Sequence, residues 1–429
     1  MNSDLSAKKN ATPLSFEEIA NIARIAPKEL ITASVAKGDD ISRDPGLLLT
    51  KKDIINIKIY EATALALPYT LEDVQAYLKF GDPNDGGIGL SYKDFLNTFI
   101  LTREHAKSWA PLNDEIRLTG TNLKIFSGQM ITYGNSIADL NAGLKNSDSI
   151  KKYLESNNIT TLAQLKNIEV TSDKHFPGIT LENGVKKDLS AYLSLILKEI
   201  NTYLQETETL DKKIIQFSDN LSNNVLPKIK TQLNLVSSNT VQADIKEIEK
   251  SISERSLRIE EKSKEYTILV EKSFDSAASL NIVGLGMAIY KGVEAEETRS
   301  LRDQLRAEQR QDIEKVSKKN QTLASLLRVR HELEGLKNIT FDAEAATKNL
   351  RHVWNAILKF IQSSKESADD INDTVSLGLF IHHFKLVVDP WKEIQKHTDI
   401  FIDIFREADE EYKRIHINNI PQHNRSMEL

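Results

Sequence analysis

The chain has no cysteine among its 429 residues, which excludes disulfide bonds, thiolate nucleophiles and cysteine-ligated metals. No uncharged apolar run reaches the ~20 residues that a transmembrane helix needs. The first residues lack the apolar core of a secretory signal peptide, so we expect no such peptide. Acidic and basic residues are mixed and the net charge is −6, which gives no bulk attraction to nucleic acid.

Glycine and proline are scarce in the second part of the chain. Between Gly184 and Gly284 there is no glycine and one proline, Pro227, and the next proline is Pro390. Because glycine and proline interrupt helices, their scarcity predicts very long helices beyond position 178. The part before it, 1–178, contains most of the helix breakers and is predicted to form several shorter helices.

Four pairs of residues in this first part have the spacing of helix N-terminal caps. In each pair an oxygen side chain precedes an acidic residue by three positions, which satisfies free backbone N–H groups at a helix start. The pairs are Ser15 with Glu18, Thr50 with Asp53, Thr70 with Asp73, and Ser91 with Asp94. The predicted helices cover residues 16–36, 51–66, 71–80, 92–108 and 112–144, followed by short pieces near 148–156 and 161–168.

Apolar residues recur every seven positions in the second part, as in a coiled coil. One stripe is Leu189, Ile196, Tyr203, Leu210 and Phe217, and its companion is Leu193, Ile200, Thr207, Ile214 and Leu221. The pattern resumes with Ile245, Ile252, Ile259 and Tyr266, and later with Leu301, Leu305, Ile313, Val316, Leu323 and Leu327. The prediction is an all-α fold, an elongated helical bundle with a very long antiparallel coiled-coil stalk ending in a short apolar tip.

The segment from Ser276 to Tyr290 carries no charge, although both flanking segments are highly charged. An uncharged segment between two charged helical arms predicts a helical hairpin with an apolar tip. Such a tip is unfavourable in water, so it is buried against the protein's own body, a partner or a membrane. We favour a membrane or partner, because a charged stalk offers the tip little to pack against.

The predicted membrane-contacting residues are the large or apolar side chains of this segment. They are Phe274, Ala277, Ala278, Leu280, Ile282, Val283, Leu285, Met287, Ile289 and Tyr290. Gly284, Gly286 and Gly292 would permit a tight turn.

The helix breakers are placed symmetrically about Asn281. Pro227 and Gly335 are equidistant from it. In an antiparallel hairpin they would lie at one level, where we predict a hinge in the stalk.

The resulting domain prediction has six parts. They are a helical bundle over 1–178, an ascending stalk helix over 179–275, the tip over 276–291, returning stalk helices over 292–389, a C-terminal helix over 390–417 and a disordered tail over 418–429. The break before the last helix is predicted at Asp389–Pro390–Trp391.

No catalytic or metal-binding constellation is present in the sequence. Asp82 and Asn84 resemble the start of a calcium loop, but Gly86 and Lys93 stand where oxygen ligands are needed. His382 and His383 are adjacent and would point about 100° apart on a helix. We therefore predict no enzyme activity, no cofactor and no metal.

With these features the chain resembles the ClyA-type α-helical pore-forming toxins, and more narrowly the A components of binary xenorhabdolysin-type toxins (XaxA/YaxA-like). The resemblance covers about residues 15–415 and rests on the architecture and on the stretch SFDSAASLNIVGLGMAIYKGVEAEE. It implies a soluble monomer, secreted by a non-Sec route or released by lysis, that attaches to a host-cell membrane by its apolar tip. It also implies a B component as partner, with which the chain assembles into a hetero-oligomeric ring.

An alternative from another class is a non-enzymatic coiled-coil scaffold or secretion-apparatus protein whose apolar tip docks to a partner protein. Neither hypothesis involves nucleic acid. Leakage of liposomes distinguishes them, because only a pore-forming component should cause it with a partner present.

Overall fold

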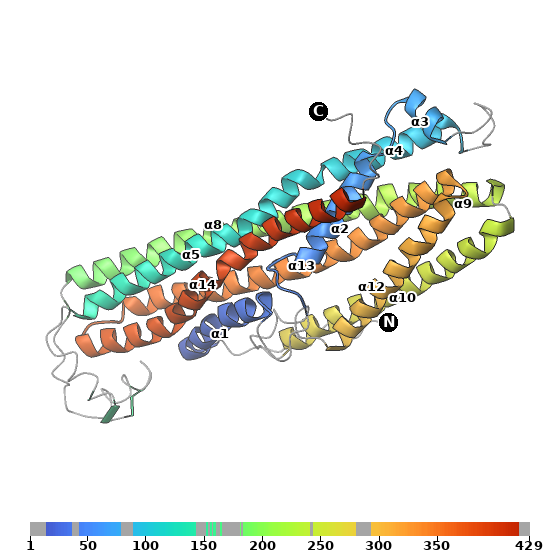
Figure 1. The fold of residues 1–429 in the computed structure, drawn as a ribbon. Coiled ribbons are helices and arrows are strands. Elements are labelled where there is room, and N and C mark those ends of the chain that lie inside the picture. The colour runs from blue at the N-terminus through green and yellow to red at the C-terminus, as the bar shows by residue number, and fades with distance from the viewer. Residues whose placement is uncertain are drawn as a thin grey trace, which may run out of the picture. The chain divides into compact units, whose positions relative to one another are not determined.

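The computed structural model describes residues 14–36, 43–78, 89–142, 181, 183–240, 243–279 and 293–419, with a few positions between 152 and 164. Within these residues every regular element is a helix, and several are very long (Figure 1). The helices are α1 (Phe16–Ser34), α2 (Lys51–Leu65), α3 (Leu71–Leu78), α4 (Tyr92–Lys107), α5 (Trp109–Ala142), α8 (Asn183–Asn220), the π-helical turn η1 (Leu221–Val225), α9 (Leu226–Thr240), α10 (Ala243–Ser279), α12 (Val293–Ser317), α13 (Gln321–Ala368) and α14 (Thr374–Asn419). The predicted all-α fold of long helices is confirmed.

The four predicted N-terminal caps are all present. Thr50 and Asp53 form a reciprocal capping box at the start of α2, and Ser91 and Asp94 form another at α4. The backbone N–H of Glu18 donates to Ser15 Oγ at 3.2 Å, and that of Asp73 donates to Thr70 Oγ1 at 3.1 Å. These local signals placed the first four helix starts correctly. Most of the predicted pieces near 148–156 and 161–168 lie outside the described residues.

Contacts divide the chain into two units. The first consists of Met1–Lys28, Phe126–Tyr203 and Val353–Glu393, and the second of Glu29–Ile125, Leu204–His352 and Ile394–Leu429.

The core of the first unit is aromatic. Phe126 packs edge-on against Trp354 and Trp391, with ring centroids 4.9 and 4.8 Å apart, and Trp354 stacks on Tyr203 at 5.6 Å. These side chains come from α5, α13, α14 and α8, so one aromatic cluster joins four helices.

The predicted break at Asp389–Pro390–Trp391 is wrong, because α14 continues through Pro390 as one helix from Thr374 to Asn419. The preceding helix, α13, ends at Ala368. A proline inside a helix costs about 3 kcal/mol, but burial of Trp391 in the aromatic cluster offsets this. The carbonyl that loses its donor belongs to Leu386, which is 41% exposed, so water can reach that face of the helix.

The apolar stripes of the predicted coiled coil are buried. All members of the two stripes between Leu189 and Leu221 are buried, as are Ile245, Ile252, Ile259 and Tyr266. The later stripe is buried at Leu305, Ile313, Val316, Leu323 and Leu327, but Leu301 is 39% exposed and was wrongly included.

The π-helical turn η1 shifts the buried stripe by one position. A continued repeat of seven after Phe217 and Leu221 would bury Asn224 and Lys228, but these are exposed and Val225 and Ile229 are buried instead. The extra residue is accommodated by an i→i−5 hydrogen bond from Leu226 N–H to the carbonyl of Leu221. Pro227 follows directly, where its missing N–H removes the next α-helical bond.

In the second unit, α8 and α9 pair antiparallel with α13 in the predicted register. Asp211 and Arg351, which are equidistant from Asn281 in the sequence, approach to 3.3 Å. Lys230 and Glu334 approach to 3.5 Å. Because these pairs flank Pro227 and Gly335, those two residues lie at one level of the paired helices, as predicted.

The helices α10 and α12 form an antiparallel hairpin with the same symmetry. Arg255 and Glu308, which are almost equidistant from Asn281 in the sequence, approach to 3.4 Å. The side-chain amide of Gln309 donates to the carbonyl of Ile252 at 3.2 Å. Both contacts join residues that lie almost equally far from Asn281 in the sequence, so the hairpin keeps the same symmetric register.

This hairpin lies along α13, which corrects the predicted single helix over 179–275. The hydroxyl of Tyr266 on α10 donates to Asp342 on α13 at 2.7 Å, and Arg330 on α13 donates to Ser256 on α10. Residue numbers rise together in these contacts, so α10 runs parallel to α13 and antiparallel to α9 (Figure 1). The chain therefore reverses between α9 and α10, and again at Lys318–Asn320 between α12 and α13.

Two apolar residues on α10 test the buried stripe. Ile259 is 2% exposed and Leu257 is 66% exposed. We expect Ile259→Ala to lower the free energy of unfolding by about 2–5 kcal/mol, because it leaves a cavity between packed helices. Leu257→Ala, the matched control, should change it by less than about 0.5 kcal/mol. Urea unfolding followed by circular dichroism measures both, and equal losses would contradict the assigned stripe.

Candidate functional site

The predicted tip lies mainly outside the described residues. Leu280, Ile282, Val283, Gly284, Leu285, Gly286, Met287, Ile289, Tyr290 and Gly292 lie outside them altogether. Phe274, Ala277 and Ala278 belong to the last turns of α10, and only their helical backbone is described. The assignment of these residues to membrane contact therefore stays a prediction. The described part of the site is the hairpin that leads into and out of the tip.

The arm α12 carries a polar stripe that the sequence analysis missed. Arg299, Arg302, Arg306 and Gln309 follow one another at steps of three, four and three, which places them on one helix face. Arg299, Arg302 and Gln309 are buried, although arginine and glutamine side chains are mostly exposed in proteins. The regular spacing of long cationic side chains was the available signal.

Asp342 is the buried centre of the contact between the hairpin and α13. Its side chain is 3% exposed and accepts the hydroxyl proton of Tyr266. The guanidinium of Arg302 lies 5.3 Å from the centre of the Tyr266 ring. Burial raises the pKa of Asp342 to about 6, although the positive charges of Arg302 and Arg43 oppose this.

Ion pairs surround this centre and involve both the hairpin and α2. Asp303 on α12 binds Lys52 on α2 at 2.6 Å and Arg302 at 3.2 Å. Arg299 binds Glu296 at 2.9 Å on the same helix. The pair of Asp303 with Lys52 joins α12 to α2, but the Lys52 side chain is half exposed, so this pair contributes about 1 kcal/mol or less. The buried hydrogen bond between Tyr266 and Asp342 joins the hairpin to α13.

The two described hinge residues have different surroundings. Pro227 follows the π-helical turn, as described above. Gly335 lies inside α13, where a Cβ atom would meet Arg306 Nη2 at 2.2 Å. The glycine thus allows the Arg306 guanidinium to lie against the α13 backbone. Its role as a hinge stays a prediction.

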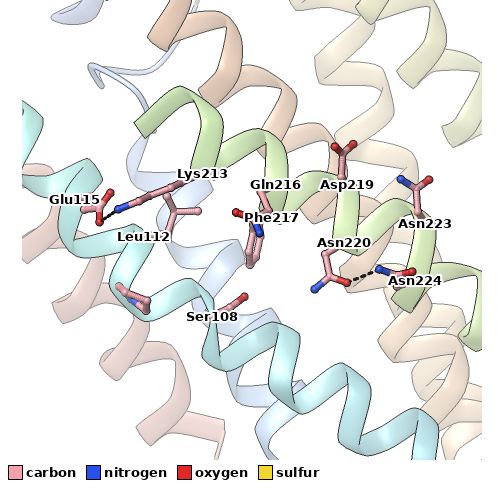
Figure 2. Close-up of a pocket in the computed structure, with 11 residues that line it drawn as sticks. Ser108, Leu112, Glu115, Lys213, Gln216, Phe217, Asp219, Asn220, Asn223 and Asn224 are labelled. Carbon is pink, nitrogen blue, oxygen red and sulfur yellow. Dashed lines mark hydrogen bonds and ion pairs between the residues drawn. The ribbon is translucent and has the colours of Figure 1, made fainter. Parts of the chain in front are cut away.

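A cleft of about 640 Å³ lies beside the π-helical turn, between the start of α5 and the end of α8 (Figure 2). Leu112 and Phe217 contribute apolar surface. An ion pair between Glu115 and Lys213 lies at one end of the cleft, and a 2.8 Å hydrogen bond between Asn220 and Asn224 lies at the other (Figure 2). The hydroxyl of Ser108 in the lining donates to the backbone carbonyl of His105 at 2.7 Å.

His105 supports the back of Phe217 in this region. Its ring stacks on Phe217 at 4.2 Å, its Nδ1 lies 2.6 Å from the Tyr60 hydroxyl and its Nε2 lies 3.2 Å from the Phe217 carbonyl. A carbonyl only accepts, so Nε2 carries the proton and Tyr60 donates to Nδ1. Burial lowers the pKa of His105, which fits this neutral, structural form.

Among the described residues, no group of three or more His, Asp or Glu side chains is placed to hold a metal ion. His382 and His383 lie edge-on to each other, with ring centroids 5.8 Å apart. None of the described helical segments combines the length and apolar character needed to cross a membrane.

Several solved structures are similar to this chain. YaxA from Yersinia enterocolitica is 26% identical over 86% of this chain and 100% of its own, with a TM-score of 0.46. The XaxAB pore complex from Xenorhabdus nematophila is 26% identical over 86% of this chain and 100% of the matched chain, with a TM-score of 0.42.

Soluble SmhA, of the tripartite α-pore-forming toxin Smh from Serratia marcescens, is 10% identical over 93% of this chain and 98% of its own, with a TM-score of 0.50. At this identity the likeness is one of fold. No protein-family model matches the chain, and no curated protein matches it.

The buried carboxyl of Asp342 gives a prediction on pH. Its pKa of about 6 in the folded chain exceeds the ordinary value of 3.8, so between these values the folded chain binds a proton that the unfolded chain does not. The contribution of Asp342 to the free energy of unfolding therefore falls as pH rises through this window. Asp342→Asn cannot titrate, so its stability relative to the wild type should increase from pH 4 to pH 7, by about 3 kcal/mol at most.

Urea unfolding of both proteins at several pH values measures this difference. The altered hydrogen bond with Tyr266 adds an offset to the difference in free energy of unfolding, and this offset does not depend on pH. The prediction therefore concerns only how the difference changes with pH. A difference that stays constant across the range would show that the carboxyl is not perturbed.

Proposed function

We propose that the chain is one component of a multi-component α-pore-forming cytolysin that binds its target membrane through residues 276–291. The observation that carries this is an uncharged, apolar segment at the turn of a hairpin whose charged arms pair along their length. Thr298 and Glu265, almost equidistant from Asn281 and close to the tip, still approach to 3.5 Å. The chain shares its fold with soluble SmhA, as a protein of this class would.

The short apolar segment also suggests a partner. A segment of this length covers ~20 Å as one helix and about half as a hairpin, against ~30 Å of bilayer hydrocarbon. The segment is thus suited to attach to a membrane but not to span it as a helical pair. We propose that a B component supplies the spanning segments in a hetero-oligomeric ring, and that this chain is a secreted, non-enzymatic protein.

Two apolar residues near the middle of the segment test membrane binding. We expect the double variant Ile282→Asp/Leu285→Asp to lose binding to liposomes while helicity and solubility are retained. Each charge in an apolar lipid-facing segment costs about 2–3 kcal/mol, so the two together should reduce binding to background. Co-sedimentation with liposomes measures the bound fraction.

The matched control introduces two aspartates at exposed positions of α10. Leu257→Asp/Ile268→Asp alters residues that are 66% and 49% exposed and should sediment like the wild type. If the tip variant also sediments normally, residues 276–291 are not the membrane contact. If the wild type neither sediments nor causes leakage with any partner, the alternative of a coiled-coil scaffold gains support.

We further propose that the stalk bends at the level of Pro227 and Gly335 when the tip engages lipid, with Gly284, Gly286 and Gly292 permitting rearrangement of the tip itself. If only one of two packed helices contained a residue that weakens it, the intact neighbouring helix would keep the pair straight. The contact between Lys230 and Glu334 indicates that both weak points lie at one level, which makes bending there easier.

A disulfide across this level tests the hinge. Val225 and Leu336 are buried at the paired level, and the chain has no cysteine of its own. We expect the oxidised Val225→Cys/Leu336→Cys variant to lose haemolysis in the presence of the B component and to regain it on reduction. The chain without a partner should not lyse cells.

The control crosslink uses Ser218 and Thr340, whose hydroxyls are 3.1 Å apart on the far side of the π-helical turn. Oxidised Ser218→Cys/Thr340→Cys should remain active, because no bending is proposed there. Full activity of the oxidised Val225→Cys/Leu336→Cys variant would rule out a hinge at this level.

A further inference from the structure

A second cavity, of about 430 Å³, lies where α12 meets α2 and α13. Lys52 and Asn56 of α2 line one side, Arg299, Arg306 and Arg310 of α12 line another, and His331 of α13 completes the wall. Four cationic side chains line this space together with the carboxyl groups of Asp44, Glu296 and Asp303. Burial and the neighbouring arginines lower the pKa of His331, so its imidazole is neutral at pH 7.

Three of these four cations have carboxylate partners. Lys52 binds Asp303 at 2.6 Å, Arg299 binds Glu296 at 2.9 Å, and Arg310 binds Glu332 at 3.0 Å. Asp44, the remaining acid of the lining, is exposed. The fourth cation, Arg306, is the exception.

Arg306 has a buried Nη1 atom without a hydrogen-bond partner. The nearby Glu334 is engaged by Lys230 at 3.5 Å and Arg330 at 3.8 Å. Burial lowers the pKa of Arg306, although the carboxylates of Glu332, Asp303 and Glu334 oppose this. A buried, unsatisfied charged donor is costly, and such groups in folded proteins commonly indicate a ligand, water or ion.

Gly335 contributes to this arrangement. A Cβ at this position would overlap the Arg306 guanidinium, so glycine lets the guanidinium lie this close to the α13 backbone.

We propose that this cavity binds a phosphate-class oxyanion, with Arg306 as its principal ligand. Planar guanidinium groups bind phosphate oxygens through paired N–H donors, and Arg306 has donors to spare. Lys52, Arg310 and Asn56 line the same space and add positive charge or an amide donor. Since the walls belong to α2, α12 and α13, a bound anion would fasten the hairpin to the helices beside it.

The ligand could be free phosphate or a phosphomonoester carried by a headgroup, because both present the same oxygens. Inorganic phosphate and glycerol 3-phosphate serve as the two probes. Competition between them at one site shows that the cavity admits a headgroup, whereas binding of inorganic phosphate alone assigns it to the free anion.

The test measures binding of inorganic phosphate to the full chain by calorimetry, together with the melting temperature in phosphate and in chloride of equal ionic strength. We expect saturable binding to the wild type and a higher melting temperature in phosphate. Arg306→Gln should bind at least ten-fold more weakly and lose the phosphate-dependent shift. Arg258→Gln, the control at an exposed arginine of α10, should behave like the wild type.

Without phosphate, Arg306→Gln should melt at or above the temperature of the wild type, because it removes a buried charged group with an unsatisfied donor. If it does not fold, Arg306→Lys keeps the charge and loses the paired donors, and it should bind several-fold more weakly. The proposal is overturned if phosphate and chloride stabilise the wild type equally, or if the Arg306 variants bind phosphate as tightly as the wild type does.

Discussion

The symmetric register of the two helical arms, in which contacting residues lie almost equally far from Asn281 in the sequence, is the constraint on which the other contacts of the second unit depend. It places Arg255 beside Glu308 in the hairpin and Asp211 beside Arg351 in the outer pair. Apolar side chains are buried only when both arms keep this register, because a slip of one position turns a helix face by about 100°. α13 then contacts α9, α10 and α12 along one helix, and this contact creates both the buried centre at Asp342 and the cavity around Arg306.

The two faces of the hairpin differ in chemistry. Between α10 and α12 the contact includes a buried apolar stripe, with Ile252 and Ile313 among its members. Toward α2 and α13, α12 presents arginines that form ion pairs and a buried carboxyl contact. An apolar stripe holds the arms together over their whole length, whereas isolated ion pairs are weak and depend on salt and pH. A hairpin of this kind can leave its neighbours without its own arms separating, which suits a protein proposed to deliver an apolar tip to a membrane.

The parts of the fold that follow from local patterns were predictable, and those that depend on a choice between equivalent packings were not. Caps such as Thr50 with Asp53 involve residues three apart, and the stripe through Ile196 and Ile259 is a simple repeat. A straight stalk and a folded one bury this stripe equally, so the reversal after α9 left no signal. Pro390 was misjudged because the burial of Trp391 depends on residues far away in the chain. The cavity was missed because an arginine such as Arg306 is normally solvated, and only the packing of three helices buries it.

The π-helical turn has a consequence for the length of the chain. It adds one residue between two regular helices, and the buried stripes on either side each keep their own spacing. In a loop an insertion is absorbed by a change of path, but here it is absorbed within a continuous helical rod by a single widened turn. Deleting one residue from Leu221–Val225 should therefore remove the widened turn and leave the partners of α9 unchanged, while Pro227 still leaves one backbone carbonyl without its α-helical donor. Helical arms that must match in length can in this way gain or lose a residue without losing their alignment.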